Sequence, residues 1–459
     1  MARALGGVGI GYRRELAHAL FARPEAVDFV EVVAEACREP AHRREAVALA
    51  EIWPVIPHGV KLSLGSAEGL DLGRARELGR LARDLRAPLV SEHVSFVRAG
   101  GREIGHLTEL PMTREAVAVV ARNVAALRRE LPDVPLLLEN VARAFVWPAS
   151  DHEMNEGEFH AEVVAATGCQ LLLDVGNLHA NAVNAGEDPF AVLASYPLES
   201  VAMLHVAGGV MEHGFYFDTH AHPVPAAVFA LVERVQACCG ALPVLLERDA
   251  NYDAPADLLA EITRLRFMGS RASSGALERA AAPLGERVAL RGRAEASLRA
   301  AVPPLEGALE RAQVAMAELL TRPDVGDASA PVVRARGVLE RKRADDALPL
   351  LPELASRIGA SDALALGRIP SVPRLATMTA VADALRIADA ARDVPALAPF
   401  ALRDGALLRA RFASGPEGPR PRSMPYVNRE ESSGGHAVWV VKGFGQGAPV
   451  RVIERGVRR

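Results

Sequence analysis

The first 265 residues alternate between short apolar runs and longer amphipathic segments. Segments such as Leu70–Leu85 and Thr113–Arg129 carry apolar residues at helical spacing, with Arg and Glu on the other face. The apolar runs are continuous, which is typical of strands that are buried on both faces. There are eight of them, at Val8–Tyr12, Asp28–Val33, Trp53–His58, Leu89–His93, Pro135–Glu139, Gln170–Asp174, Val201–His205 and Pro243–Glu247.

Eight β–α units in about 260 residues predict a closed (β/α)8 barrel, or TIM barrel, over residues 1–266. A doubly wound open sheet is the alternative, but such a sheet rarely needs eight units of this regularity. The first half of the chain is therefore predicted to be one α/β domain.

After Arg266 the pattern changes. Residues 267–275 contain Gly269-Ser-Arg-Ala-Ser-Ser-Gly275 and are predicted to be a linker. From residue 276 to about 412 the chain is rich in Ala, Leu, Arg and Glu, which favours helices, and prolines interrupt the pattern. The tail from Val438 to Glu454 predicts a β-hairpin around Gly443–Gly447. Residues 276–459 should thus form a mostly helical C-terminal domain with a short hairpin.

Composition narrows the function only modestly. The net charge of -4 over 459 residues gives no reason to expect nucleic acid or an anionic membrane as a partner. The four cysteines include no CxxC pair, which argues against a disulfide framework or a thiolate zinc site. No signal peptide and no run of about 18 apolar residues is visible, so we expect a cytoplasmic protein.

Polar residues of one chemical kind stand at the ends of the predicted strands. Because the carboxyl ends of barrel strands open on one face, these residues should converge there. Clustered carboxylates in a low-dielectric site repel one another, and divalent cations remove that cost. A single His at a strand end is more often a hydrogen-bonded core residue, but that explanation must here hold at six strands independently. We therefore predict a site for iron, zinc or manganese, formed by His58, His93, Glu139, Asp174, His205 and Glu247.

The loops after strands six and seven carry further ligand types. Asp174-Val-Gly-Asn177-Leu-His179 follows strand six, and Asp218-Thr-His220-Ala-His222 follows strand seven. A DxH pair places two ligands on the same side of an extended segment, which suits chelation of one ion. Residues expected within reach of the mouth, with structural and functional roles equally weighted, are Glu31, Glu35, Asn140 and His179, and weaker candidates are His222 and Asp249. Three other histidines, His106, His152 and His160, are expected at the surface.

The order of these ligands resembles that of the xylose-isomerase-like barrels, which include the trinuclear nuclease endonuclease IV. The resemblance implies a first ion held by His58, His93 and Glu139. It implies a second ion held by Glu139, Asp174, His205 and Glu247, with Glu139 bridging the two. Asp218 and His220 match the DxH pair of the third ion. The DxxH motif departs, because Asn177 stands where the superfamily has His, and a third ion would then be loosely held or absent.

Several short sequence motifs resemble those of a narrower family, the multinuclear non-haem iron-dependent oxidative enzymes. The resemblance covers roughly residues 5–266. The motifs on which it rests are Asp28-Phe-Val-Glu31, Lys61-Leu-Ser-Leu-Gly-Ser66, Leu137-Leu-Glu-Asn140, Leu172-Leu-Asp-Val-Gly-Asn177, Leu204-His-Val-Ala-Gly208 and Phe217-Asp-Thr-His220.

This resemblance implies two or three irons in a mixed-valent Fe(II)/Fe(III) centre that uses O2 to modify a ribosomally made precursor peptide. The modified residue is commonly Cys, converted to an oxazolone-thioamide, a thiooxazole or a shortened product, and some members act on Asp or Asn. Glu139, Asp174 and His205 are then the expected catalytic centre. Members usually need a partner protein that binds the leader segment of the precursor, and residues 276–459 are placed to be that partner within one chain.

Three other functions stay open from the sequence. A zinc hydrolase that cuts abasic DNA would need a basic groove, and residues 1–266 show none. A sugar isomerase with two divalent ions fits the ligand spacing, although Asn177 and the motifs that resemble the peptide-modifying iron enzymes argue against it. A metal-storing or metal-sensing barrel would bind metal tightly without consuming oxygen.

Overall fold

The computed structural model describes residues 5–145, 147–212, 214–252, 255–279, 307–322, 330–371, 375, 378–415, 418–432 and 436–454. The chain forms two compact units. Unit 1 comprises Met1–Val97 and Leu107–Arg311, and unit 2 comprises Arg98–His106 and Ala312–Arg459. Each unit is described by itself.

Unit 1 is built on a closed barrel of eight parallel strands, as the sequence predicts. Around the barrel the order is β1-β2-β3-β4-β7-β8-β9-β12, so neighbours along the chain are also neighbours in space. The strands are β1 (Val8–Gly11), β2 (Phe29–Val33), β3 (Val55–Gly59), β4 (Val90–His93), β7 (Leu136–Glu139), β8 (Gln170–Asp174), β9 (Val201–Val206) and β12 (Val244–Leu246).

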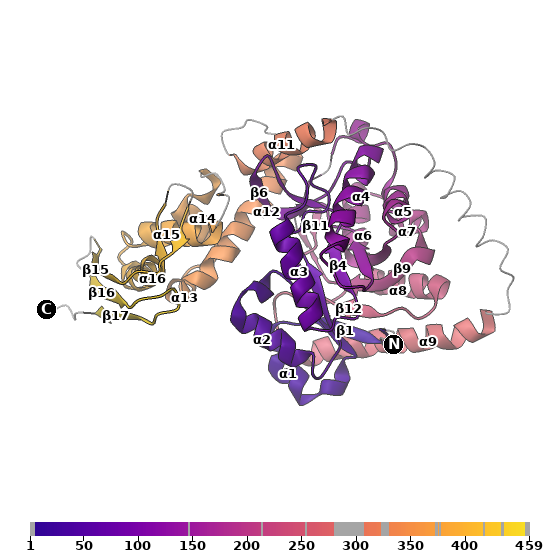
Figure 1. Ribbon diagram of the computed structural model, residues 1–459, viewed down its shortest axis with the longest axis horizontal. Helices are drawn as coiled ribbons and strands as arrows, with labels where there is room; N and C mark the ends of the chain where they lie inside the picture. The colour runs from indigo at the N-terminus through magenta and orange to yellow at the C-terminus, as the bar shows by residue number, and fades with distance from the viewer. Residues whose placement is uncertain are drawn as a thin grey trace. The chain divides into compact units, whose positions relative to one another are not determined.

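Helices surround this barrel (Figure 1). They are α1 (Ala17–Ala22), α2 (Pro40–Leu49), α3 (Leu72–Asp84), α4 (Arg114–Arg128), α5 (Glu156–Thr167), α6 (Val175–Ala185), α7 (Pro189–Ser195), α8 (Ala226–Cys239) and α9 (Pro255–Arg279). Two short hairpins extend from strand–helix loops, namely β5 (Phe96–Ala99) with β6 (Arg102–Thr108) and β10 (Val210–Glu212) with β11 (Phe215–Phe217). The two amphipathic segments named from the sequence form α3 and α4. Each helix begins after a capping side chain, Asp71 for α3 and Thr113 for α4, which accepts hydrogen bonds from backbone N–H groups of the first turn.

An apolar layer inside the barrel lies directly beneath the polar strand ends. Its members are Phe29, Ile56, Leu89, Leu137, Leu172, Met203 and Leu245. All seven stand two residues before a polar residue, as Leu137 does before Glu139 and Met203 before His205. Side chains two residues apart on a strand point to the same face, so the polar residues also enter the barrel interior, one layer above. The apolar layer seals the floor beneath them.

The predicted linker is helical instead. Helix α9 continues through residues 267–275 and ends at Arg279. Its earlier turns bury Leu258, Ile262 and Leu265 at helical spacing, and a helix nucleated in this way extends at low cost through Ser and Ala. One helical Gly costs only about 1 kcal/mol relative to Ala. Residues 280–306 of the predicted C-terminal domain lie outside the described residues.

Unit 2 combines helices with a small antiparallel sheet. Its first helix is α11 (Ala308–Thr321), of which the part from residue 312 onward belongs to unit 2. The other helices are α12 (Ala330–Ala347), α13 (Pro352–Ala355), α14 (Ala360–Gly367), α15 (Thr379–Ala391) and α16 (Ala398–Arg411). The predicted hairpin is present as β16 (Ala437–Lys442) and β17 (Val450–Glu454), and β15 (Tyr426–Glu431) adds a third strand that the pattern did not predict. Two short strands, β13 (Phe412–Ala413) and β14 (Arg420–Pro421), pair between α16 and β15.

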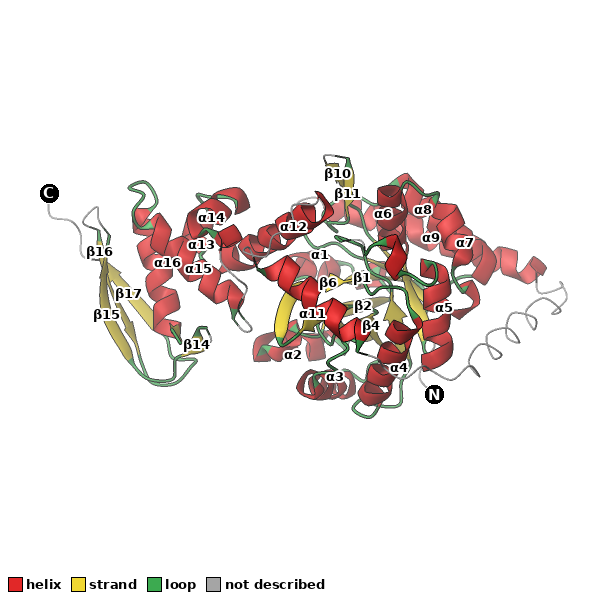
Figure 2. Ribbon diagram, turned by 90° about the horizontal axis from the view of Figure 1, so that it is seen from above, coloured by secondary structure: helices red, strands yellow, loops and turns green. Residues whose placement is uncertain are grey.

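One face of this sheet packs on α16, as Figure 2 shows. Val438 and Val440 of β16 contact Leu402 and Ala406 of the helix. The opposite face carries exposed apolar side chains, Val427, Trp439 and Ile453. Within the described parts of the chain, we find no helix with the length and apolar character needed to cross a bilayer.

Candidate metal centre

Three strand ends bring together the residues predicted for a first ion. Ligand atoms of His58, His93 and Glu139 all lie within 4.8 Å of one another, and all three residues are buried. Oε2 of Glu139 is 3.5 Å from Nε2 of His58 and 3.3 Å from Nε2 of His93. The arrangement offers two nitrogens and one oxygen to a single cation.

The residues predicted for a second ion also converge. Glu139, Asp174, His205 and Glu247 form one buried group with the same 4.8 Å spacing. Nδ1 of His205 is 3.1 Å from Oε1 of Glu139 and 3.6 Å from Oε1 of Glu247. Glu139 therefore presents one oxygen to each group, which is the geometry of a bridging carboxylate.

Neighbouring polar atoms orient the imidazoles. Nδ1 of His58 lies 2.9 Å from Oγ of Ser91, and Nδ1 of His93 lies 3.1 Å from the carbonyl oxygen of Gly59. Both rings therefore direct Nε2 toward Glu139. Gly59 also has to be small, because a Cβ there would lie 2.9 Å from Cγ of Glu92.

Glu31 lies closer to the centre than the sequence indicates. Its Oε2 is 3.3 Å from Nε2 of His205 and 3.5 Å from Oγ of Ser91. Glu31 also forms a third buried group of ligand atoms with His58 and Glu247. Nε2 of His205 makes no hydrogen bond in this structure, and a carboxylate that accepts from the far nitrogen of a metal-bound imidazole would fix its tautomer and raise its basicity.

The DxH pair borders the second group. Nε2 of His220 is 2.7 Å from Oδ2 of Asp218, and Nδ1 of His220 is 3.1 Å from Oε2 of Glu247. His220 has a φ of 52°, a left-handed conformation that is uncommon for a residue other than Gly. Asn177 is buried nearby on α6, and its side-chain amide donates to the carbonyl oxygen of Asn140.

The other predicted neighbours bond to the backbone or an aromatic ring. Asn140 brackets the backbone of Asp174, because its Nδ2 donates to the carbonyl oxygen (2.9 Å) and its Oδ1 accepts from the amide (2.8 Å). Glu35 accepts the backbone amides of Val60 and Lys61 and so holds the loop after β3. His179 is buried with its ring 5.2 Å from that of Tyr216, in an edge contact.

Sequence reasoning missed three contributors and misplaced two histidines. The ring nitrogens of His106, expected at the surface, are buried. Ser91 and Glu92 are buried beside His93, and polar residues inside an otherwise apolar strand were the available signal. Arg13 forms an ion pair with Asp249, a residue given little weight from the sequence. His160, expected at the surface, is 5% exposed and stacks on Tyr196, because α5 turns it inward.

Protonation in this cluster follows from burial and charge. Burial lowers the proton affinity of His93, but the carboxylates of Glu139 and Glu92 outweigh it and raise its pKa to about 9. Burial raises the pKa of Asp174 to about 7, and the neighbouring Asp218 adds to the shift. Without a metal ion, bound protons on the imidazoles and carboxyl groups thus reduce the negative charge of the cluster. A divalent cation would neutralise the same carboxylates and release those protons.

Buried ligand atoms without a hydrogen bond indicate that the residues fit such a cation. Among the described residues, Oε2 of Glu139, Oδ2 of Asp174, both ring nitrogens of His205 and Oδ1 of Asp218 are buried and accept or donate no hydrogen bond. Leaving a buried polar atom unsatisfied costs roughly 1–3 kcal/mol. Metal coordination would satisfy several of these atoms together, and the nitrogen and oxygen donors suit iron, zinc or manganese.

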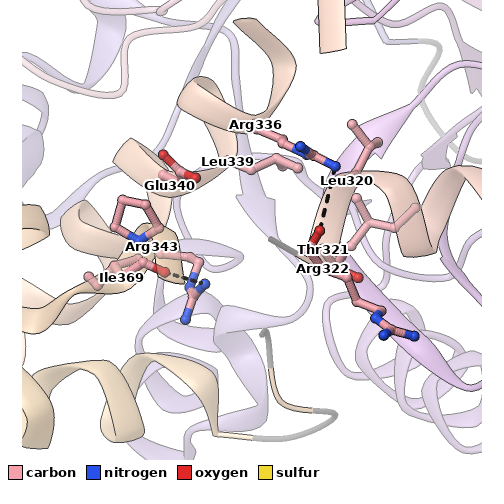
Figure 3. A pocket seen from close by; sticks show the side chains of 10 residues that line it. Leu320, Thr321, Arg322, Arg336, Leu339, Glu340, Arg343 and Ile369 are labelled. Carbon is pink, nitrogen blue, oxygen red and sulfur yellow. Dashed lines mark hydrogen bonds between the residues drawn. The ribbon is translucent and has the colours of Figure 1, made fainter. Parts of the chain in front are cut away.

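A small cavity in unit 2 has a different character (Figure 3). It holds about 30 Å³, enough for an ordered water, and arginines line much of it. Arg336 donates to the carbonyl oxygen of Leu319, and Arg343 bonds both carboxylate oxygens of Asp383 at 2.9 Å. These arginines are already bonded to protein atoms, so we interpret the cavity as structural.

Comparisons with known proteins follow the same division of the chain. The family described as "RiPP precursor modification enzyme MbnB/TglH/ChrH" matches residues 7–269. A UPF0276 protein of Streptomyces avermitilis is 44% identical over 276 residues, which is 58% of this chain and 55% of that protein, so the match spans little more than half of that relative. A UPF0276 protein of Caulobacter vibrioides is 38% identical over 275 residues, 58% of this chain and 96% of its own length.

Solved structures match this chain at low sequence identity and low TM-score. Endonuclease IV from Thermus thermophilus is 20% identical with a TM-score of 0.39, and the match covers 56% of this chain and 98% of that one. The IOLI protein with a binding zinc atom is 13% identical with a TM-score of 0.40, covering 59% and 98%.

Proposed function

Because the chain belongs to the MbnB/TglH/ChrH family of RiPP precursor modification enzymes, we propose that its barrel binds two or three irons and uses O2 to modify a precursor peptide, commonly at Cys. The observation that carries the proposal is the position of Glu139. Its two oxygens face two separate groups of buried ligands, His58 with His93 on one side and His205 on the other. Two-metal sites with a bridging group typically hold their ions about 3.5–4 Å apart.

Each residue would have a definable task in that reaction. His58 and His93 would bind the first ion through Nε2, and Asp174, His205 and Glu247 would bind the second, with Glu139 shared. Bound iron would supply redox chemistry with O2 and a binding position for a substrate thiolate. Asn140 fixes the backbone of Asp174, and Glu31 would fix the tautomer of His205. The apolar layer beneath the ligands excludes water from below.

The third ion position is proposed at Asp218 and His220, with Asn177 as a weaker, neutral ligand. Oδ1 of Asp218 is buried without a hydrogen-bond partner among the described residues, which leaves it available to a cation. The hydrogen bond between His220 and Asp218 would have to open for both to bind one ion. A loosely held third ion is consistent with that competition.

Elemental analysis and Mössbauer spectroscopy of protein purified anaerobically from iron-fed cells test the proposal. We expect two or three irons per chain with an antiferromagnetically coupled mixed-valent pair. Oxygen consumption should then depend on a Cys-containing precursor peptide. Stoichiometric zinc or manganese that iron does not replace would favour a hydrolase or a sugar isomerase. Tightly bound metal without oxygen consumption would favour a storage or sensing protein.

For residues 276–459 we propose recognition of the precursor's leader segment, in place of a separate partner protein. The support is the three-stranded sheet of unit 2, in which β15 and β17 each pair with β16 alone among the described strands. An extended peptide can add to such an edge through main-chain hydrogen bonds. Removal of residues 413–459 should abolish peptide binding while leaving the metal content of the barrel unchanged. Retained peptide affinity would refute this role.

A further inference from the structure

A cavity of about 380 Å³ lies in unit 1 beside the candidate metal centre. It is formed by the residues that follow β1, by the end of β2 and by α2. The lining includes Tyr12, Arg13, Val33, Ala36, Cys37 and His42. Its volume falls within the range of about 300–1,000 Å³ that is typical of small-molecule sites.

The cavity adjoins the metal centre through two short connections. On β2, Glu31 belongs to the buried ligand group, and the next two residues, Val32 and Val33, line the cavity. On the other side, Arg13 lines the cavity and pairs with Asp249, whose Oδ2 is 3.5 Å from Nδ1 of His220. The cavity is therefore linked to the candidate ligands through the end of β2 and through the Arg13–Asp249 ion pair.

The accessible surface of the cavity is mainly apolar, and its charged lining residues are two arginines, Arg13 and Arg14, and two glutamates, Glu15 and Glu45. Glu45 accepts from the Tyr12 hydroxyl at 2.8 Å and from Nε of Arg14 at 2.6 Å, so its carboxylate is neutralised within the wall. Burial raises the pKa of the Cys37 thiol to about 11, which keeps it protonated and neutral near pH 7. The remaining surface comes from side chains such as Val33, Ala46 and Leu49.

From this geometry we propose that the cavity binds an apolar side chain of the precursor peptide, close in sequence to the residue that is modified. The proposal rests on the proposed function, since the ligand is a part of that peptide substrate. A neutral apolar wall favours an aliphatic or aromatic side chain over a charged one, because a charge would lose its hydration without gaining a partner. The cavity then sets sequence preference, and the metal centre sets the chemistry.

Binding of two capped amino acids to the full chain tests this site. N-acetylphenylalaninamide carries an apolar side chain, whereas N-acetylglycinamide has the same backbone without one. We expect the phenylalanine compound to bind at least tenfold more tightly, measured by calorimetry.

A filled cavity provides the matched comparison. Ala36 lines the cavity at an exposed position, so Ala36→Trp should occupy the space without disturbing the core. Ala48→Trp adds the same side chain at an exposed position of α2 that does not line the cavity. Ala36→Trp should weaken N-acetylphenylalaninamide binding at least tenfold, and Ala48→Trp should leave it within twofold.

The outcome separates this inference from the proposed function, because binding of the capped amino acids requires neither metal nor O2. Equal binding of the two compounds, or equal binding by the two variants, would overturn the cavity proposal even if the chain oxidises a peptide. Selective binding that only Ala36→Trp abolishes would support it even if the metal analysis redirects the chemistry to another reaction on peptides.

Discussion

Nδ1 of His205 lies 3.1 Å from Oε1 of Glu139, and both side chains are buried at the top of the barrel interior. The second oxygen of the same carboxylate faces His58 and His93. Glu139 thus lies between two nitrogen-bearing groups that come from opposite directions along the chain. This one relationship distinguishes a site for a metal pair from two unrelated sites.

Substitution of Glu139 should therefore lower the number of bound metal ions more than substitution of any one histidine. We expect Glu139→Ala to lower the metal content by about two ions per chain and His93→Ala by about one, measured by elemental analysis after iron loading. His18→Ala, at an exposed position, is the control and should retain the wild-type content. Equal losses in the Glu139 and His93 variants would show that the two groups do not share this carboxylate.

Glu31 should tune metal affinity without setting the stoichiometry. Its carboxylate is 3.3 Å from Nε2 of His205, and partners of this kind are typically worth about 10–100-fold in metal affinity. Glu31→Gln should therefore weaken binding by that factor in a titration against a competing chelator. The number of ions at saturation should not change.

Glu35→Gln is the matched comparison for Glu31. Glu35 contacts backbone amides of the loop after β3, and no contact of its side chain with a candidate ligand is seen in the described part of the chain. We expect its metal affinity to stay within about threefold of wild type, well below the range for a direct partner. Identical effects in both variants would contradict a direct role for Glu31.

The barrel and the convergence of the candidate ligands were predictable because they follow from local patterns. Continuous apolar runs identified eight strands, and residues at the ends of those strands must meet on one face. Glu31 was harder to weigh, because its contact with His205 crosses the barrel interior between β2 and β9, which are not neighbouring strands. Ser91 and Glu92 precede a predicted ligand and were overlooked for lack of a motif.

Longer-range features could not be predicted from the chain alone. Arg13 meets Asp249 only because β1 pairs with β12, which joins the two ends of the barrel sequence. The segment at residues 267–275 is helical because burial of earlier residues of α9 outweighs the weak propensity of Gly and Ser. The third strand β15 lacks apolar alternation, and its pairing with β16 decides its conformation.

Arg143 should be essential for stability near the mouth of the barrel. It lies between two buried carboxylates, with Nε 2.7 Å from Oε2 of Glu109 and a further ion pair to Glu156. Arg143→Met would leave both carboxylates buried without this cation, at a cost of about 3–5 kcal/mol in urea unfolding. Arg114→Met is the control, because Arg114 is exposed and its ion pair with Glu153 at 3.9 Å should contribute less than about 1 kcal/mol.

A second change checks the cause of that loss. Burial raises the pKa of Glu109 to about 8, although Arg143 opposes the shift, so this carboxyl is mostly protonated near pH 7. The unpaired charge left by Arg143→Met then lies on Glu156, and Glu156→Gln in the Arg143→Met background should recover part of the stability. If the double variant is no more stable than Arg143→Met, then the loss arises from packing and not from unpaired charge.

His160 should make the barrel sensitive to mild acid. Burial lowers its pKa to about 4, against an ordinary value of about 6.5 in the unfolded chain. Below about pH 6.5 the unfolded chain gains a proton that the folded protein does not accept, so stability falls as the pH drops toward about 4. This one group contributes at most about 1.4 kcal/mol per pH unit within that window.

His160→Phe keeps a ring against Tyr196, which stacks on His160 at 5.3 Å, and removes the titrating group. Thermal unfolding at about pH 7 and about pH 5 should therefore show a smaller decrease of Tm for His160→Phe than for wild type. His18→Phe, at an exposed position, should show the wild-type decrease. An unchanged decrease in His160→Phe would mean that the acid sensitivity arises from other groups.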